Sequence, residues 1–417
     1  MILINIGDEL LIGQVVNTNA AFIGQQMALA GFSLTDVLTI GDNGDDIRQT
    51  VSAALAKTDV VLMTGGLGPT KDDITKKVIC DIFQRSLVMD EPTLEHVTQL
   101  FAARGMELTD TNRDQALVPD GCTVLYNPLG TAPGLWMEDN GKVLIALPGV
   151  PFEMERLIKE EVMPRLKNRD ERHHAIEYRV LQCTGITESG LSDLLVDYER
   201  ELPAELKLAY LPKPGIIRLR LTGQSDDREK LLEMLDEQFQ KLKVLTKEYA
   251  FTDEDIELEE VVGRLLVKAN KTLATAESCT GGYIAHLITK VPGSSRYFQG
   301  SLVSYSNEVK RDLLNVREDN LKRRGAVSEQ VVSDMALNAM GLFDVDYTIA
   351  TSGIAGPDGG TAQKPVGTVW IAIATPVRLI TKEFHFGSRT GRQQIVERAA
   401  HAALNMLRIA IEQDLNL

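Results

Sequence analysis

Blocks of apolar and polar residues alternate along the first 165 positions of the chain. Three apolar runs predict strands, at residues 2–6, 37–40 and 60–63. Helical spacing of apolar positions follows them, at residues 19–30 and 45–55 and in a segment that ends at Phe83. This order predicts a doubly wound α/β domain, with a parallel sheet, right-handed crossovers and helices on both faces.

Glycine and acidic residues follow each of the three predicted strands. They form "GDE" at residues 7–9, "GDN" at 41–43 and "GGLG" at 65–68. Ligands of such folds bind outside the carboxyl ends of the parallel strands. We therefore expect a site where these three turns meet.

Residues 171–250 have a different pattern. "EYRVLQCTG" and "IIRLRLTG" predict strands, whereas "TESGLSDLLVDYERE" and residues 228–243 predict amphipathic helices. The pattern fits a small α+β module. Since it has no evident catalytic cluster, we expect a spacer or assembly role.

The stretch "FTDEDIELEE" (251–260) holds six acids and no base. It is either a charged linker or a helix start in which Thr252 is the cap and Asp255 completes a capping box. From residue 271 strand and helix patterns alternate again and predict a second α/β domain. The expected domains are residues 1–170, 171–250 and 251–417.

Composition narrows the class of protein. The net charge of −15 over 417 residues weighs against binding to nucleic acid or to an anionic membrane. The start "MILINIGDELL" lacks the pattern of a signal peptide, and no apolar run approaches the roughly 20 residues of a membrane helix. We therefore expect a cytoplasmic protein. Its four dispersed cysteines do not indicate a disulfide framework or a cysteine-rich zinc site.

The stretch "TGGLGPTKDD" (64–73) combines features that suit a phosphate ligand. Backbone N–H groups at Gly65, Gly66 and Gly68 can approach an anion, and a helix N-terminus follows. Asp72 and Asp73 can bind a hard divalent cation. They can equally cap the helix together with Thr70, and both interpretations stay open.

Two further loops, "NPLGTAPG" (127–134) and "LPGVPFEM" (147–154), have glycine and proline in tight turns. Glu153 follows the second turn, where it can join Asp8 or Asp72 in a set of carboxylates. Together with "GDELLIGQVVNTN" and "TGGLGPTKDD", these loops resemble the molybdopterin-binding-like domain of the CinA family (competence/damage-inducible protein A) over the first 165 residues.

The resemblance implies metal-dependent hydrolysis of ADP-ribose to AMP and ribose 5-phosphate. The metal would be Mg, Mn or Co, possibly with K. The residues implied around the ligand and metal are Asp8, Asn19, Gly66, Thr70, Asp72, Asp73, Asn127, Thr131 and Glu153. The middle module of the family is KH-like, but no GxxG loop lies in residues 171–250, and we expect no RNA binding.

Four stretches of the last third resemble the C-terminal nicotinamide-nucleotide amidohydrolase domain of the same family. They are "AESCTGG" (276–282), "PGSSRYFQGSLVSYSNEVK" (292–310), "SGIAGPDGG" (352–360) and "KPVGTVW" (364–370). The resemblance implies hydrolysis of nicotinamide mononucleotide to nicotinic acid mononucleotide and ammonia, without a cofactor.

Amide hydrolysis needs a nucleophile, a proton acceptor and donors for an oxyanion. All six histidines lie outside these four motifs, so a serine activated by a lysine fits better than a Ser-His-Asp triad. The resemblance points to Ser278, Ser295, Tyr305 and Lys310. We expect Ser295 to be the nucleophile, with Ser278 as the alternative, Lys310 the base and Tyr305 an orienting or relaying hydroxyl.

The stretch "AESCTGG" also predicts a helix start after Gly281, capped by Ser278 or Thr280, whose free N–H groups can seat an oxyanion or phosphate. Glu277 either offsets the positive pyridinium ring or holds the turn, and Cys279 is expected to be a buried thiol.

Backbone amides near Gly353 and Gly356 suit a ribose phosphate. Arg389 and Arg392 can pair with that phosphate.

Three hypotheses for function remain open: two active hydrolase sites, an active amidohydrolase with a nucleotide-binding first domain, and a non-enzymatic accessory protein of competence or DNA damage. Expected partners are nicotinamide mononucleotide, ADP-ribose and a second copy of the chain. Neither nucleic acid nor a membrane is expected.

Overall fold

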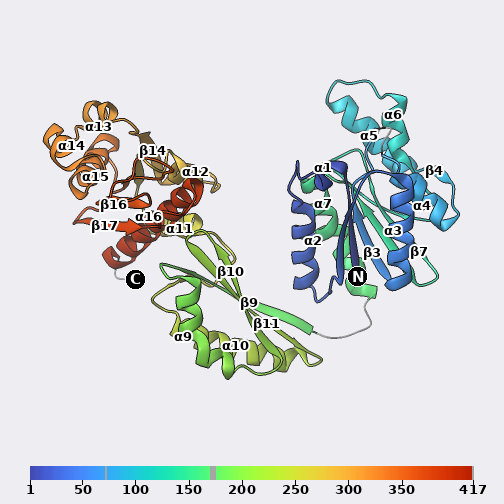
Figure 1. Cartoon of the computed structure of the whole chain (residues 1–417). Helices are drawn as coiled ribbons and strands as arrows, with labels where there is room; N and C mark the ends of the chain where they lie inside the picture. Colours follow the sequence, from blue (N-terminus) through green and yellow to red (C-terminus); the bar gives the residue numbers. More distant parts are fainter. Residues whose placement is uncertain (71–72, 170–174, 416–417) are drawn as a thin grey trace. The chain divides into compact units, whose positions relative to one another are not determined.

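The computed structural model describes residues 1–70, 73–169 and 175–415, which form two compact units. The first unit is Met1–Ile176 with Ser225–Arg228, and the second is Glu177–Gln224 with Glu229–Leu417 (Figure 1). The α/β class predicted for both ends of the chain is confirmed. No helix in the described part of the chain is long and apolar enough to span a membrane.

A six-stranded sheet in the order β2-β1-β3-β8-β7-β6 forms the centre of the first unit. Its strands are β1 (Ile2–Ile6), β2 (Asp36–Ile40), β3 (Val60–Thr64), β6 (Thr123–Leu125), β7 (Gly134–Asp139) and β8 (Lys142–Leu147). β2, β1, β3 and β8 are parallel to one another. β7 is antiparallel to β8, and β6 is antiparallel to β7, so the prediction of a parallel sheet is wrong at this edge. Asn140 and Gly141, at φ 49° and 77°, form the two-residue turn that reverses the chain between β7 and β8.

Helices cover both faces of this sheet, as predicted. Ile47 and Ile79 pack with Ile4 on one face, whereas Ile23 and Met154 pack with Leu3 on the other. The helices are α1 (Asp8–Leu11), α2 (Thr18–Leu29), α3 (Gly44–Lys57), α4 (Thr75–Phe83), α7 (Pro151–Leu157), the π-helical turn η2 (Ile158–Val162) and α8 (Met163–Arg169). A small lobe adds β4 (Leu87–Met89), α5 (Glu91–Ala103), α6 (Asp110–Arg113), η1 (Asp114–Ala116) and β5 (Leu117–Pro119).

The second unit begins with a four-stranded sheet in the order β10-β11-β9-β12. Its elements are β9 (Ala175–Thr184), α9 (Glu188–Arg200), β10 (Leu206–Lys213), β11 (Ile216–Ser225), α10 (Arg228–Leu245) and β12 (Ala250–Thr252). Both predicted strands and both predicted helices are present. Of the two interpretations of residues 251–260, the helix cap at Thr252 is wrong, because its hydroxyl accepts the N–H of Glu254 and the next helix begins only at Leu258.

The rest of the second unit is built on a five-stranded sheet in the order β14-β13-β15-β16-β17. β13 is parallel to β14 and β15, and the other two pairs are antiparallel. The strands are β13 (Leu273–Glu277), β14 (Phe298–Val303), β15 (Tyr347–Gly353), β16 (Thr368–Ala374) and β17 (Leu379–His385). The helices are α11 (Leu258–Ala269), α12 (Tyr283–Thr289), η3 (Ser294–Arg296), α13 (Asn307–Leu314), α14 (Glu318–Arg324), α15 (Glu329–Phe343) and α16 (Arg392–Asp414).

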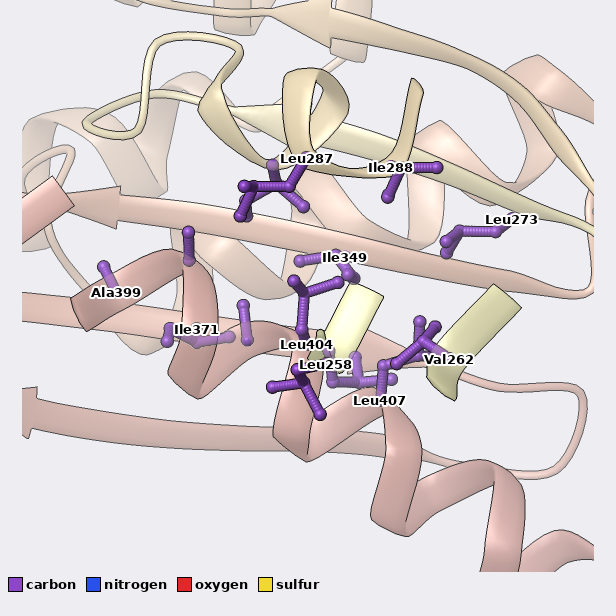
Figure 2. Close-up of a cluster of buried hydrophobic side chains, with 14 of the residues drawn as sticks. Leu258, Val262, Leu273, Leu287, Ile288, Ile349, Ile371, Ala399, Leu404 and Leu407 are labelled. Atoms are coloured by element: carbon purple, nitrogen blue, oxygen red, sulfur yellow. The ribbon is translucent and has the colours of Figure 1, made fainter. Parts of the chain in front are cut away.

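Figure 2 shows the core on one face of this sheet. Leu258 of α11 and Leu404 of α16 lie in one buried cluster with Ile349 and Ile371 of the sheet. Ile216 of β11 belongs to the same cluster. The small four-stranded sheet is therefore packed onto the larger one through a shared hydrophobic core.

Candidate active site

The carboxyl ends of two parallel strands bring Ser278 and Lys310 together. Ser278 follows β13, and Lys310 lies in α13, which follows β14. Lys310 Nζ donates to Ser278 Oγ at 2.9 Å, to the carbonyl oxygen of Ser304 at 2.6 Å and to that of Tyr305 at 3.2 Å. Only 1% of the Lys310 surface is exposed, so three acceptors fix this amine in one position.

Burial lowers the pKa of Lys310 from 10.5 to about 8. No carboxylate in the described part of the chain forms an ion pair with this amine. A lysine with such a pKa is partly neutral near physiological pH and can accept a proton from a hydroxyl. Ser278 and Lys310 thus have the geometry and electrostatics of a nucleophile and its general base.

The structure does not bring Ser295 to this pair. Ser295 lies in η3 before the amino end of β14, whereas Lys310 follows the carboxyl end of that strand. Leu273 pairs with Phe298 and Glu277 with Val303, so the two ends are separated by four residue steps along β13, about 13 Å at 3.3 Å per residue. The expectation that Ser295 lies beside Lys310 is therefore wrong, and Ser278 occupies that position.

A cavity of about 170 Å³ opens beside the Ser278–Lys310 pair. Its lining is Ser278, Cys279, Tyr305, Lys310, Ala326, Val327, Ser352, Gly353, Ala355 and Arg392. Among the residues expected around the substrate, Gly353 and Arg392 line it and the exposed Arg389 does not.

The hydroxyl of Tyr305 does not orient the pair, contrary to expectation. It accepts a hydrogen bond from Arg392 at 2.9 Å, and Arg392 also donates to the carbonyl of Gly356 at 2.7 Å. The hydrogen bond that Lys310 donates to Tyr305 goes to the main-chain carbonyl. Arg392 therefore joins the loop 353–360 to Tyr305 at the rim of the cavity.

Glu277, not Ser278 or Thr280, holds the start of α12. Its fully buried carboxylate accepts the N–H groups of Gly282 at 3.0 Å, Ile284 at 3.1 Å and Ala285 at 2.8 Å. Thr280 instead shares a hydrogen bond of 2.8 Å with Thr351. The first N–H groups of α12 are thus already bonded to Glu277. The expectation that they bind an oxyanion or a phosphate is wrong.

The thiol of Cys279 is buried, as predicted. Burial raises its pKa to about 12, so it is neutral at physiological pH. A neutral buried thiol is a poor nucleophile.

Two residues that the sequence did not single out shape the cavity wall. Lys364 Nζ donates to the carbonyls of Arg324 at 2.7 Å and Val327 at 2.6 Å, and Ser352 Oγ donates to Ala326 at 2.7 Å. Both donors lie inside the motifs "KPVGTVW" and "SGIAGPDGG". Their acceptors lie in residues 324–327, which carry no motif, so only the tertiary structure connects them.

Polar side chains also lie at the carboxyl ends of the parallel strands in the first unit, where the sequence predicts a ligand site. Asn19 Nδ2 donates to Thr64 Oγ1 at 3.2 Å and to the carbonyl of Gly149 at 2.8 Å. Within the described residues its Oδ1 is buried without a hydrogen-bond partner. A Cβ at Gly65 would lie 2.3 Å from the carbonyl of Ile6, so this turn requires glycine.

The acids of this edge lie in separate small groups. Asp73 accepts the N–H of Thr70 at 2.8 Å and also its hydroxyl, and it lies against Gly68. Buried Glu153 accepts Asn127 Nδ2 at 2.7 Å, and burial raises the pKa of this carboxyl.

Asp8 is exposed beside Gly41, whereas Asp72 lies outside the described residues. Thr131 is half-buried, and Gly66 follows Gly65 at φ 67°. Across residues 1–70, 73–169 and 175–415, no three His, Cys, Asp or Glu side chains are placed to hold one metal ion.

Lys76 is a further buried amine near this edge that the sequence analysis missed. It donates to the carbonyl of Gln115 at 2.7 Å, and burial lowers its pKa to about 8. The sequence contained a sign of this burial, because Lys76 precedes Ile79 and Cys80 on the apolar face of α4.

Comparisons with known proteins give matches to three successive segments of the chain. Family models match residues 2–168 as a probable molybdopterin binding domain, 178–252 as a damage-inducible protein CinA KH domain, and 255–411 as a CinA C-terminal domain. A CinA-like protein of Cytophaga hutchinsonii is 42% identical, over 99% of this chain and 98% of that protein. One of Flavobacterium psychrophilum is 44% identical, over 97% of each.

A solved competence/damage inducible protein from Agrobacterium tumefaciens is 36% identical and covers 39% of this chain and 99% of its own, with a TM-score of 0.36.

Proposed function

This chain belongs to the CinA family, and from that premise we propose that its second unit is a nicotinamide-nucleotide amidohydrolase. It would hydrolyse nicotinamide mononucleotide to nicotinic acid mononucleotide and ammonia. The observation that carries the proposal is the 2.9 Å hydrogen bond between a buried Lys310 of lowered pKa and Ser278 at the base of a cavity.

In this mechanism neutral Lys310 takes the proton of Ser278 Oγ while Oγ bonds to the carboxamide carbon. The C–N bond then breaks, and Lys310 returns the proton to the leaving nitrogen, which departs as ammonia. Water hydrolyses the ester on Ser278, with Lys310 again as the base. Arg392 at the rim is suited to the phosphate of the nucleotide.

The direct test is incubation of the purified chain with nicotinamide mononucleotide. Ammonia and nicotinic acid mononucleotide should form in equal amounts, and the Lys310→Met variant should form neither at a comparable rate. A folded wild-type chain that releases no ammonia would exclude this function.

For the first unit, the proposal is metal-dependent hydrolysis of ADP-ribose to AMP and ribose 5-phosphate. Asp8 and Asp73 supply hard oxygen donors, and a Mg²⁺ ion shared with substrate phosphates needs only one or two protein carboxylates. The residues therefore fit a metal that is bound together with its diphosphate substrate. The metal would supply charge neutralisation and an activated water.

Appearance of AMP from ADP-ribose only in the presence of a divalent cation tests this second activity. Ammonia release without AMP would favour the alternative in which the first unit only binds nucleotides. If neither product formed, a non-enzymatic role in competence or DNA damage would be favoured. The expected homodimer also remains a proposal, to be tested by sedimentation.

A further inference from the structure

A second cavity of the second unit lies at the amino end of β14, the end opposite the Ser278–Lys310 pair. Its volume is about 320 Å³, compared with about 170 Å³ for the cavity beside that pair. One wall is a stripe along α11, whose members are three or four residues apart and therefore share one face of the helix. They are Glu260, Gly263, Arg264, Val267 and Lys268.

The other wall is the stretch "PGSSRYF" (292–298), the first part of a motif that resembles the amidohydrolase domain. The structure places this stretch away from Ser278, so catalysis there gives it no role. Its Pro292, Arg296 and Tyr297 line the second cavity together with the preceding Val291. Val291 is half-buried and Pro292 is exposed, so this wall offers apolar surface to a ligand.

Two basic side chains of the cavity have no acidic partner. Arg264 pairs with Glu254 at 2.7 Å and with Glu260 at 2.8 Å, so its charge is offset. Lys268 and Arg296 are exposed and form no ion pair in the described part of the chain. The Nε atom of Arg296 donates to a carbonyl of its own turn at 3.4 Å, which leaves the two terminal nitrogens for a ligand. In a chain with a net charge of −15, two unbalanced cations at one cavity favour an anion.

The hydroxyl of Tyr297 is a buried donor without an acceptor. Only 2% of Tyr297 is exposed, and its hydroxyl has no hydrogen-bond partner in residues 1–70, 73–169 and 175–415. It occupies the side-chain place of Gly263 on the lining stripe, since a Cβ there would lie 2.4 Å from the oxygen. Burial raises the pKa of Tyr297, so the hydroxyl keeps its proton and can donate. Buried hydroxyls are seldom unpaired, and this one indicates a place for a ligand oxygen.

We propose that this cavity binds a mononucleotide, at a site separate from that of Ser278 and Lys310. Lys268 and Arg296 hold the phosphate, the Tyr297 hydroxyl donates to one of its oxygens, and the base lies on the apolar wall. Small-molecule sites have volumes of about 300–1,000 Å³ and combine apolar walls with a few polar groups, and a single nucleotide suits the lower end of that range. The inference goes beyond the proposed function and does not depend on it.

The test measures the acetylation rate of Lys268 in the full-length chain, by mass spectrometry of its peptides, with AMP as the probe. This readout reports the second cavity even though the first unit is also proposed to bind nucleotides. With AMP at about ten times its Kd the site is about nine-tenths occupied, so acetylation of Lys268 should slow about tenfold. Lys322, on the exposed face of α14, is the control and should react at an unchanged rate. Adenosine, which lacks the phosphate, should protect Lys268 only at a concentration at least about tenfold higher.

Arg296→Gln should raise the AMP concentration for half-protection by about tenfold or more, because a charged donor to the phosphate is lost. Arg200→Gln, on the exposed face of α9, is the matched control. Tyr297→Phe should raise that concentration about threefold or more and leave the urea midpoint of the free chain unchanged, because its hydroxyl has no partner to lose. This second variant keeps the test decisive if Arg296→Gln does not fold.

Equal acetylation of Lys268 with and without AMP, up to about 10 mM, would overturn the inference. A Lys268 that resists acetylation already in the free protein would overturn it as well, because the cavity would then be covered by protein. Protection that is the same in Tyr297→Phe, Arg296→Gln and the wild type would place AMP elsewhere and refute the assigned contacts. Ammonia release from nicotinamide mononucleotide is measured separately, so failure of this site leaves the amidohydrolase proposal standing.

Discussion

Lys310 Nζ and Ser278 Oγ lie 2.9 Å apart, 32 residues apart in sequence, at the carboxyl ends of adjacent parallel strands. Because the amine is buried and has no carboxylate partner in the described structure, its hydrogen-bonding capacity is directed to one hydroxyl and two carbonyls. This relationship supports the proposed roles of Lys310 as base and Ser278 as nucleophile, and predictions for the second unit follow from it.

Ser278→Ala should lower the rate of nicotinamide mononucleotide deamidation by about a thousandfold or more, because the attacking hydroxyl is lost. Ser295→Ala, on the exposed η3 at the far end of β14, is the matched control and should stay within about threefold of wild type. Ammonia release measures both. If Ser295→Ala lost more activity than Ser278→Ala, Ser295 would be the nucleophile and the proposed pair of Ser278 and Lys310 would be refuted.

The pH dependence of kcat/KM should follow the neutral fraction of Lys310. With a pKa of about 8, activity should rise about tenfold per pH unit below that value and level off above it. Lys310→Met should lose at least about a hundredfold and show no such rise. A wild-type profile that is flat between pH 6 and 9 would contradict this role.

The same pKa shift makes a prediction for stability. Between about 8 and 10.5 the unfolded chain binds the Lys310 proton and the folded chain does not, so the free energy of unfolding should rise with pH in that window. Lys310→Met should lack this component. Urea titrations at several pH values measure the free energy of unfolding of both chains. If it changed equally with pH in the two chains, that would argue against a lowered pKa of Lys310.

Glu277→Gln should destabilise the second unit by about 1–3 kcal/mol, since the new amide cannot accept all three N–H bonds and presents donors to donors. Urea unfolding followed by the fluorescence of Trp370, in a Trp136→Phe background, measures it. If Glu277 served chiefly to offset the pyridinium charge, the variant would keep its stability and only KM would rise.

Lys364→Met should raise KM for nicotinamide mononucleotide by about tenfold with little change in kcat, because the wall at residues 324–327 loses two charge-assisted hydrogen bonds. Lys322→Met, on the exposed face of α14, is the control and should behave as wild type. Equal KM values for the two variants would show that Lys364 does not position this wall.

Removal of divalent cations with a chelator should abolish AMP formation from ADP-ribose and leave ammonia release unchanged. Asp73→Ala should likewise cost about a hundredfold in the first activity only. Both products are measured on the same protein sample. Loss of both activities together would indicate coupled sites or misfolding.

Local patterns in the sequence determined much of this molecule. Apolar runs such as residues 2–6 and 60–63 predicted strands that the structure contains, since burial of a strand on both faces needs a continuous apolar run. Amphipathic spacing likewise predicted the two helices of residues 171–250, which the structure contains as α9 and α10. The motifs also contained Ser278, Lys310 and Gly353, which line one cavity together with Arg392.

Only the tertiary structure decided which of these residues meet. Both serines lie in motifs, but the parallel pairing of β13 with β14 places Ser278 beside Lys310 and Ser295 at the opposite end of the sheet. The acceptors of Lys364 were equally outside the reach of local pattern. Periodicity reports the burial of each element, whereas strand order and register, which are set by contacts between distant segments, determine the distances on which chemistry depends.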